Sequence, residues 1–117
     1  MSYDIRLAIK TEFGGFIVID EPYYSSPTYN LGILFRKCTN WDFTQGEYYK
    51  CSEVLHLIKG GYRELVAHPT KYEKYLPDNG WGTMMDAQDC LRNIWECIDK
   101  NIYDNYRIPI EYLYIKW

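Results

Sequence analysis

Apolar residues recur every three or four positions in one long stretch of the chain, from Thr83 to Ile102. This spacing places them on one face of a helix that packs against a core. Thr83 and Asp86 put a hydroxyl acceptor and a negative charge over the first turn, where backbone N–H groups are free. The pattern therefore predicts an amphipathic helix that organises the fold. Its apolar face comprises Met84, Ala87, Leu91, Ile94, Trp95, Ile98 and Ile102.

Two other segments have helical spacing. Ser26 followed by Pro27 is typical of a helix start, and the apolar positions from Leu31 to Cys38 predict a short helix after it. A second pattern resumes at Tyr48 or Lys50 and runs to Pro69. Gly60-Gly61 lies inside this second pattern, which predicts either a bend or a close approach to another element. The residues from Thr39 to Glu47, and again from Thr70 to Gly82, have no such period and are predicted as loops.

Strand patterns occupy both ends of the chain. Apolar and polar residues alternate from Tyr3 to Lys10, and the apolar run Phe16–Ile19 follows the turn residues Gly14-Gly15, which predicts a hairpin. The second strand is apolar on both faces, so it is expected to lie centrally in its sheet. A final strand is predicted from Ile108 to Trp117.

The predicted order is therefore β-β-α-α-α-β, an α+β fold in a single domain covering residues 1–117. Helices are expected to cover one face of a three-stranded antiparallel sheet, in which the last strand pairs with one of the first two.

Length and composition limit the classes of protein that this chain can represent. With 117 residues and 47% hydrophobic residues, it suits one domain with one core and is not disordered. Neither a long apolar run nor a leader-like segment is visible, so a cytoplasmic protein without a membrane partner is predicted. The net charge of −3 is spread evenly along the chain, so a nucleic-acid partner is not favoured. A homo-oligomer is left open.

The cysteines and histidines do not form a recognised site. Cys38, Cys51, Cys90 and Cys97 include no C-x₂-C pair, so reduced and partly buried thiols are favoured over disulfides or a metal. His56 lies within a helical pattern and His68 lies at its end, where histidine is common for structural reasons. We therefore predict no metal and no cofactor.

The most unusual feature is the placement of the aromatic residues. Thirteen tyrosines and four tryptophans exceed what a core of this size needs, and many lie beside polar residues in predicted loops. Aromatic faces stack on planar groups while phenols, amides and carboxylates bind their edges, so a nucleotide-like small molecule is the predicted ligand. A protein-contact surface is the alternative, because Tyr and Trp are also enriched at interfaces. The candidate ligand-binding residues are Tyr23, Tyr24, Tyr29, Asn30, Trp41, Asp42, Gln45, Glu47, Tyr48, Tyr49, Asp78, Asn79, Trp81 and Thr83.

The segment Asp78–Thr83 has two interpretations. Two glycines directly before a helix N-terminus leave backbone N–H groups available to an anion. Asp78 and Asp86 would repel that anion, however, and the segment lacks the lysine of a Walker loop. An ordinary turn and helix cap is the alternative.

Catalysis is a third class of function. Cys51 or Cys38 with a histidine could make a nucleophile and base, and Asp42 with Glu47 a pair of carboxylates. Neither spacing is diagnostic, and no set of residues supplies a nucleophile, a base and an oxyanion site. The prediction is that the chain is not an enzyme, with a small hydrolase as the second alternative.

Three segments resemble a known group of proteins. SSPTYNLG at Ser25–Gly32, WDFTQGEYYK at Trp41–Lys50 and DNGWGT at Asp78–Thr83 are similar to small uncharacterised proteins of phages and other mobile elements of Gram-positive bacteria. Small proteins of such origin often antagonise host defence. The resemblance therefore implies a binding protein in the host cytoplasm that sequesters a nucleotide signal, or alternatively an anti-CRISPR-like inhibitor that blocks a host defence protein.

Overall fold

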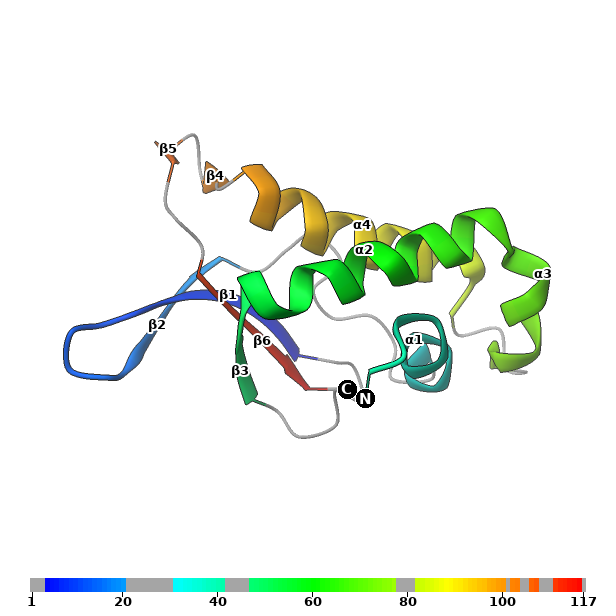
Figure 1. Cartoon of the computed structure of the whole chain (residues 1–117), viewed down its shortest axis with the longest axis horizontal. Coiled ribbons are helices and arrows are strands. Elements are labelled where there is room, and N and C mark those ends of the chain that lie inside the picture. Colours follow the sequence, from blue (N-terminus) through cyan, green and yellow to red (C-terminus); the bar gives the residue numbers. More distant parts are fainter. Residues whose placement is uncertain are drawn as a thin grey trace.

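Four antiparallel strands form the main sheet, and helices cover one of its faces (Figure 1). The computed structural model describes residues 4–20, 31–41, 47–77, 82–100, 102–103, 106–107 and 111–116. The helices are α1 (Gly32–Thr39), α2 (Cys51–Ala67), α3 (Pro69–Tyr72), the 3₁₀ helix η2 (Glu73–Tyr75) and α4 (Met84–Lys100). The strands are β1 (Asp4–Lys10), β2 (Phe16–Asp20), β3 (Glu47–Lys50), β4 (Ile102–Tyr103), β5 (Tyr106–Arg107) and β6 (Tyr112–Lys116).

The strand order in the main sheet is β2-β1-β6-β3, and β4 and β5 form a separate two-stranded ladder. The predicted pairing of the last strand is confirmed, because β6 pairs with β1 in a register that sets Leu7 beside Leu113. The predicted number of strands is wrong. Residues assigned to a loop and to the start of a helix form β3, which pairs with the other side of β6. β3 has only four residues and is followed directly by α2. Its alternation of side chains is therefore too short to distinguish a strand from the neighbouring helical pattern.

The first two strands form the predicted hairpin. Its turn is closed by hydrogen bonds from the Gly14 N–H to the Thr11 carbonyl at 3.1 Å and from the Thr11 N–H to the Gly15 carbonyl at 2.7 Å. Gly14 has a φ of 87°, a left-handed conformation that glycine adopts without a steric cost, as in a three-residue hairpin loop with a bulge. The Gly15 N–H also donates to the Thr11 hydroxyl at 3.1 Å.

The predicted central position of the second strand is wrong, because β2 lies at an edge of the sheet. Apolar residues on both faces of a strand usually indicate burial on both faces. Here Ile17 is 52% exposed and Val18 is 41% exposed. Figure 1 shows the reason, since the hairpin of β1 and β2 extends beyond the helices that cover the rest of the sheet.

A single cluster of buried residues joins the sheet to the helices. Leu7 and Leu113 come from the central strands, and they belong to the same cluster as Phe35, Ile58 and Leu91 from three different helices. All five are fully buried. The apolar face of each helix and one face of the sheet therefore bury each other, as the sequence pattern predicts.

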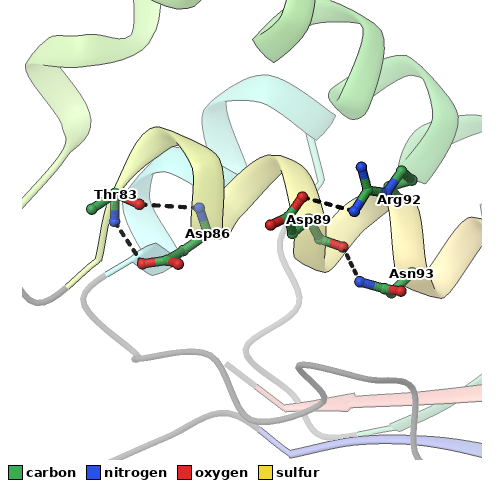
Figure 2. Close-up of polar contacts among 5 residues, drawn as sticks. All are labelled: Thr83, Asp86, Asp89, Arg92 and Asn93. Carbon is green, nitrogen blue, oxygen red and sulfur yellow. Dashed lines mark hydrogen bonds and ion pairs between the residues drawn. The ribbon is translucent and has the colours of Figure 1, made fainter.

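The start of α4 is as predicted. The Asp86 N–H donates to the Thr83 hydroxyl and the Thr83 N–H donates to the Asp86 carboxylate, both at 3.1 Å (Figure 2). This reciprocal pair is a capping box, with Asp in the usual position of Glu. The predicted end at Ile102 is wrong, because the helix ends at Lys100 and Ile102 belongs to β4. Further along α4, Arg92 pairs with the Asp89 carboxylate at 2.9 Å, and the Asn93 amide donates to the Asp89 carbonyl at 2.7 Å (Figure 2).

The diglycine in α2 marks a close approach and does not end the helix. A Cβ on Gly61 would lie 2.6 Å from the Thr39 Cγ2 atom and 3.3 Å from a Leu91 methyl, so α1 and α4 both pack against this point. One of the two predicted alternatives, the close approach, is confirmed. The segment after α2 is not the predicted loop throughout, because it contains α3 and η2. The predicted start of the first helix at Ser26 lies outside the described residues.

None of the helices in the described ranges is both long enough and apolar enough to cross a membrane.

Candidate functional site

The structure places only part of the predicted aromatic–polar site. The side chains of Trp41, Tyr48, Tyr49 and Thr83 are described, and Glu47 is placed only as the first residue of β3. The other candidates lie outside the described residues: Tyr23, Tyr24, Tyr29, Asn30, Asp42, Gln45, Asp78, Asn79 and Trp81.

Tyr48 and Tyr49 lie on opposite faces of the sheet, because successive side chains of a strand alternate. Tyr49 lies opposite the buried Leu113, on the face that the helices cover. Its ring meets the Trp41 ring edge-on, with centroids 4.6 Å apart, and both rings pack against the core. These two candidates therefore help to close the helix-covered side of the sheet.

Tyr48 belongs to a different group of rings on the uncovered face. Its ring stacks on Phe16 with centroids 3.9 Å apart and planes 2° from parallel, and lies 5.0 Å from the ring of Tyr114. Tyr112 meets Phe16 edge-on at 5.0 Å. We call Phe16, Tyr48, Tyr112 and Tyr114 the open-face aromatic cluster. Arg6 extends it, because its guanidinium lies 5.3 Å from the centre of the Tyr114 ring.

A small residue allows the open-face aromatic cluster to form across the width of the sheet. Phe16 is on β2 and Tyr48 is on β3, with β1 and β6 between them. Ala8 lies in β1 between Val18 and Tyr112, on the same uncovered face. Its small side chain leaves room for the rings, and it has no exposed surface although none of the described helices covers this face. Phe16, Tyr112 and Tyr114 are not among the predicted site residues, because they belong to strand patterns and the predicted site is built from loops.

Thr83 serves as a helix cap in the structure, which is the alternative given for its segment. Its hydroxyl accepts a hydrogen bond from the Asp86 N–H, and its own N–H is bound by the Asp86 carboxylate. A ligand contact by Thr83 stays a prediction, and such a ligand would compete with these two bonds.

A surface pocket that the sequence did not indicate lies where β3 passes into α2. Its volume is about 430 Å³, and it is lined by Lys50, Cys51, Ser52, Glu111 and Tyr112. The Cys51 N–H donates to the Glu111 carbonyl at 2.8 Å, which holds the residue before β6 against the start of the helix. No sequence spacing relates these two segments, so only the pairing of β3 with β6 reveals the pocket.

The thiols proposed as alternative nucleophiles are poorly suited to that role. Burial raises the pKa of Cys38 and of Cys51 to about 12, so neither thiol is appreciably ionised at neutral pH. His56 and His68 are both exposed on the helical layer. Cys38, Cys51 and Cys90 are buried, Cys97 is half-buried, and none of the four forms a disulfide, in agreement with the predicted thiols.

The residues described here include no group of three His, Cys, Asp or Glu side chains that could hold a metal ion. The carboxylate pair named for the alternative of a hydrolase, Asp42 with Glu47, lies outside the described side chains.

No protein-family model, curated protein or solved structure matches this chain.

Proposed function

We propose that this chain is a non-enzymatic binding protein that occupies a surface of a protein partner through its open-face aromatic cluster. The observation that carries this proposal is the group of aromatic rings on the sheet face that none of the described helices covers. Phe16 is 37% exposed there, and Arg6 lies over the neighbouring Tyr114. Aromatic residues and arginine are the types that dominate the centres of protein interfaces.

The geometry of the rings favours a protein over an enclosed planar ligand. Phe16 and Tyr48 stack with centroids only 3.9 Å apart, so no planar group fits between them. Trp41 and Tyr49 lie on the other face, packed against the core. Tyr48 therefore does not face the same space as Trp41 and Tyr49. Sequestration of a nucleotide-like molecule would have to rely on candidates outside the described residues, and it stays a prediction.

The class of partner that we propose is a host defence protein. This part of the proposal rests on the resemblance of the three segments to proteins of phages and mobile elements, and it makes the chain an inhibitor that blocks its target by occlusion.

A transformation assay tests the proposal. The chain would be expressed in Gram-positive cells whose CRISPR–Cas system, or another defined defence system, excludes a target plasmid. We expect it to restore transformation against at least one system. Phe16→Ser should abolish this effect, because it removes an exposed ring of the open-face aromatic cluster. Val66→Ser is the matched control, since Val66 is an exposed apolar residue of α2 outside that cluster.

A thermal-shift screen of the purified chain against cyclic and linear nucleotides separates the two modes of action. The protein-blocking proposal expects no shift. A nucleotide present at a hundred times its Kd would add about 2.7 kcal/mol to the free energy of unfolding if it bound only the folded chain. Such a shift, together with full activity of Phe16→Ser, would overturn the proposal in favour of sequestration.

A further inference from the structure

We propose that two copies of this chain pair through the outer edges of their β2 strands, antiparallel to each other, so that both main sheets become one continuous sheet. The proposal goes beyond the proposed function and does not depend on it. It rests on the exposure of β2, on the direction of its backbone groups and on the symmetry of its side chains.

The first observation is that residues 16–18 of β2 lack the usual protection of an edge strand. It is the outermost strand in the order β2-β1-β6-β3, and its outer side faces no other strand of the described chain. Phe16, Ile17 and Val18 are all exposed, although they are apolar and belong to both faces of the strand. Edge strands that stay unpaired are normally blunted by lysine, proline or a bulge. Residues 16–18 contain neither residue, and the irregular part of the β1–β2 ladder comes after Val18.

The second observation concerns which backbone groups point outward. The Thr11 N–H donates to the Gly15 carbonyl, so Thr11 and Gly15 form a hydrogen-bonded pair at the end of the hairpin. Such pairs alternate along an antiparallel ladder. The next hydrogen-bonded pair is therefore Ile9 with Ile17. It follows that the N–H and C=O groups of Phe16 and Val18 point toward the free edge.

The outward N–H and C=O groups of one copy are complementary to those of a second copy related by a two-fold axis. When two β2 strands run antiparallel with Ile17 on the axis, Phe16 of each copy lies opposite Val18 of the other. Phe16 of one copy and Val18 of the other then exchange two hydrogen bonds through their outward N–H and C=O groups. The two-fold axis produces a second, identical pair, so four donors and four acceptors are satisfied. The hydrogen-bonding pattern of the backbone is therefore satisfied in a register with Ile17 on the two-fold axis.

The side chains are equally self-complementary. Phe16 and Val18 share the uncovered face, so each copy contributes a ring beside a β-branched residue, a favourable cross-strand pair. On the other face, Ile17 meets Ile17 of the second copy. No charged side chain lies within residues 16–18. A surface that complements itself is what an isologous dimer requires, whereas a foreign strand would need a sequence fitted to this one, so the second copy is the occupant we assign.

Sedimentation equilibrium over protein concentrations from about 1 µM to about 1 mM tests this pairing. The mass of the parent chain should rise from monomer to dimer and no further. Ile17→Lys should remain monomeric throughout, because it sets two like charges opposite each other across the axis. Ile33→Lys is the matched control and should dimerise like the parent, since Ile33 on α1 is 53% exposed, nearly the same as Ile17.

A second variant tests the hydrogen bonds without adding charge. Val18→Pro removes an N–H that points to the free edge, and an edge strand tolerates proline in that position. It should also be monomeric, with a circular dichroism spectrum like that of the parent. A parent that is monomeric at every concentration, or an Ile17→Lys variant that dimerises like the parent, would overturn the proposal. Growth beyond a dimer would overturn it too, because it would require a head-to-tail contact. All these readouts are made on the purified protein, so they are independent of the transformation assay.

Discussion

At the scale of single residues, the two glycines of α2 show how differently one residue type can act at adjacent positions. Gly61 lies where α1 and α4 both approach α2, so closely that a methyl group would overlap the side chain of Thr39. Gly60 has nothing within 4 Å of the place where its Cβ would be. Gly61 is therefore required by packing, whereas Gly60 only lowers the stability of the helix.

Alanine at these two positions should change stability in opposite directions. We expect Gly61→Ala to lower the free energy of unfolding by about 1 to 3 kcal/mol, because the added methyl overpacks the contact between three helices. Gly60→Ala should raise it by about 0.5 to 1 kcal/mol, because alanine restricts the unfolded chain and favours the helix. Urea unfolding followed by circular dichroism measures both. Equal effects of the two substitutions would contradict the close approach at Gly61.

At the scale of elements, local signals and the pairing of the long strands were predictable from the sequence, whereas β3 and its pairing were not. The capping box at Thr83 and the hairpin turn at Gly14 depend on neighbouring residues only, so their spacing was sufficient. β3 depends on a partner strand far along the chain, and its four residues carry too little alternation to predict it. Because β3 was missed, Tyr48 and Tyr49 were assigned to one loop site, although strand alternation separates them. Apolar residues on both faces of β2 predict burial, whereas the structure shows exposure at an edge of the sheet.

The capping box gives a prediction for α4. Thr83→Ala removes the acceptor of the Asp86 N–H, which should cost about 0.5 to 2 kcal/mol of stability. Thr83→Ser is the control and should cost much less, because serine keeps the hydroxyl. Thermal or urea unfolding of the parent and the two variants measures these differences in stability. If alanine and serine behave alike, the hydroxyl does not stabilise the start of α4.

At the scale of the whole molecule, the buried thiols link stability to alkaline pH. Burial raises the pKa of Cys38 and Cys51 to about 12, from an ordinary value of 9.0, and it also raises the pKa of Cys90. As the pH rises above 9, the unfolded chain loses these protons before the folded protein does. The unfolded state then binds fewer protons, so the free energy of unfolding must fall with pH.

This linkage can be measured by urea unfolding between pH 8 and pH 10.5. Each buried thiol should contribute a fall that approaches about 1.4 kcal/mol per pH unit once the pH exceeds its unfolded pKa. Cys51→Ala should show a shallower fall than the parent. Val54→Ala is the control, because it also removes buried atoms from α2 but no thiol. Its free energy of unfolding should fall with pH as steeply as that of the parent. A Cys51→Ala slope as steep as that of the parent would mean that this thiol ionises equally in both states.

The place of β6 in the sheet has a consequence for the rate and order of folding. β6 lies between β1 and β3, yet it follows both of them in the sequence. In the described chain, four α-helices separate it from β1 and three separate it from β3. Until residues 112–116 are available, β1 has only β2 as a partner and β3 has none. The packing of α2 on α4 involves nearer segments and can form first, whereas closing the sheet requires the most distant contacts, which form slowly. During synthesis on the ribosome, a chain that does not yet include β6 therefore exposes an unpaired edge of β1. Such an edge can pair with a strand of another chain and start aggregation.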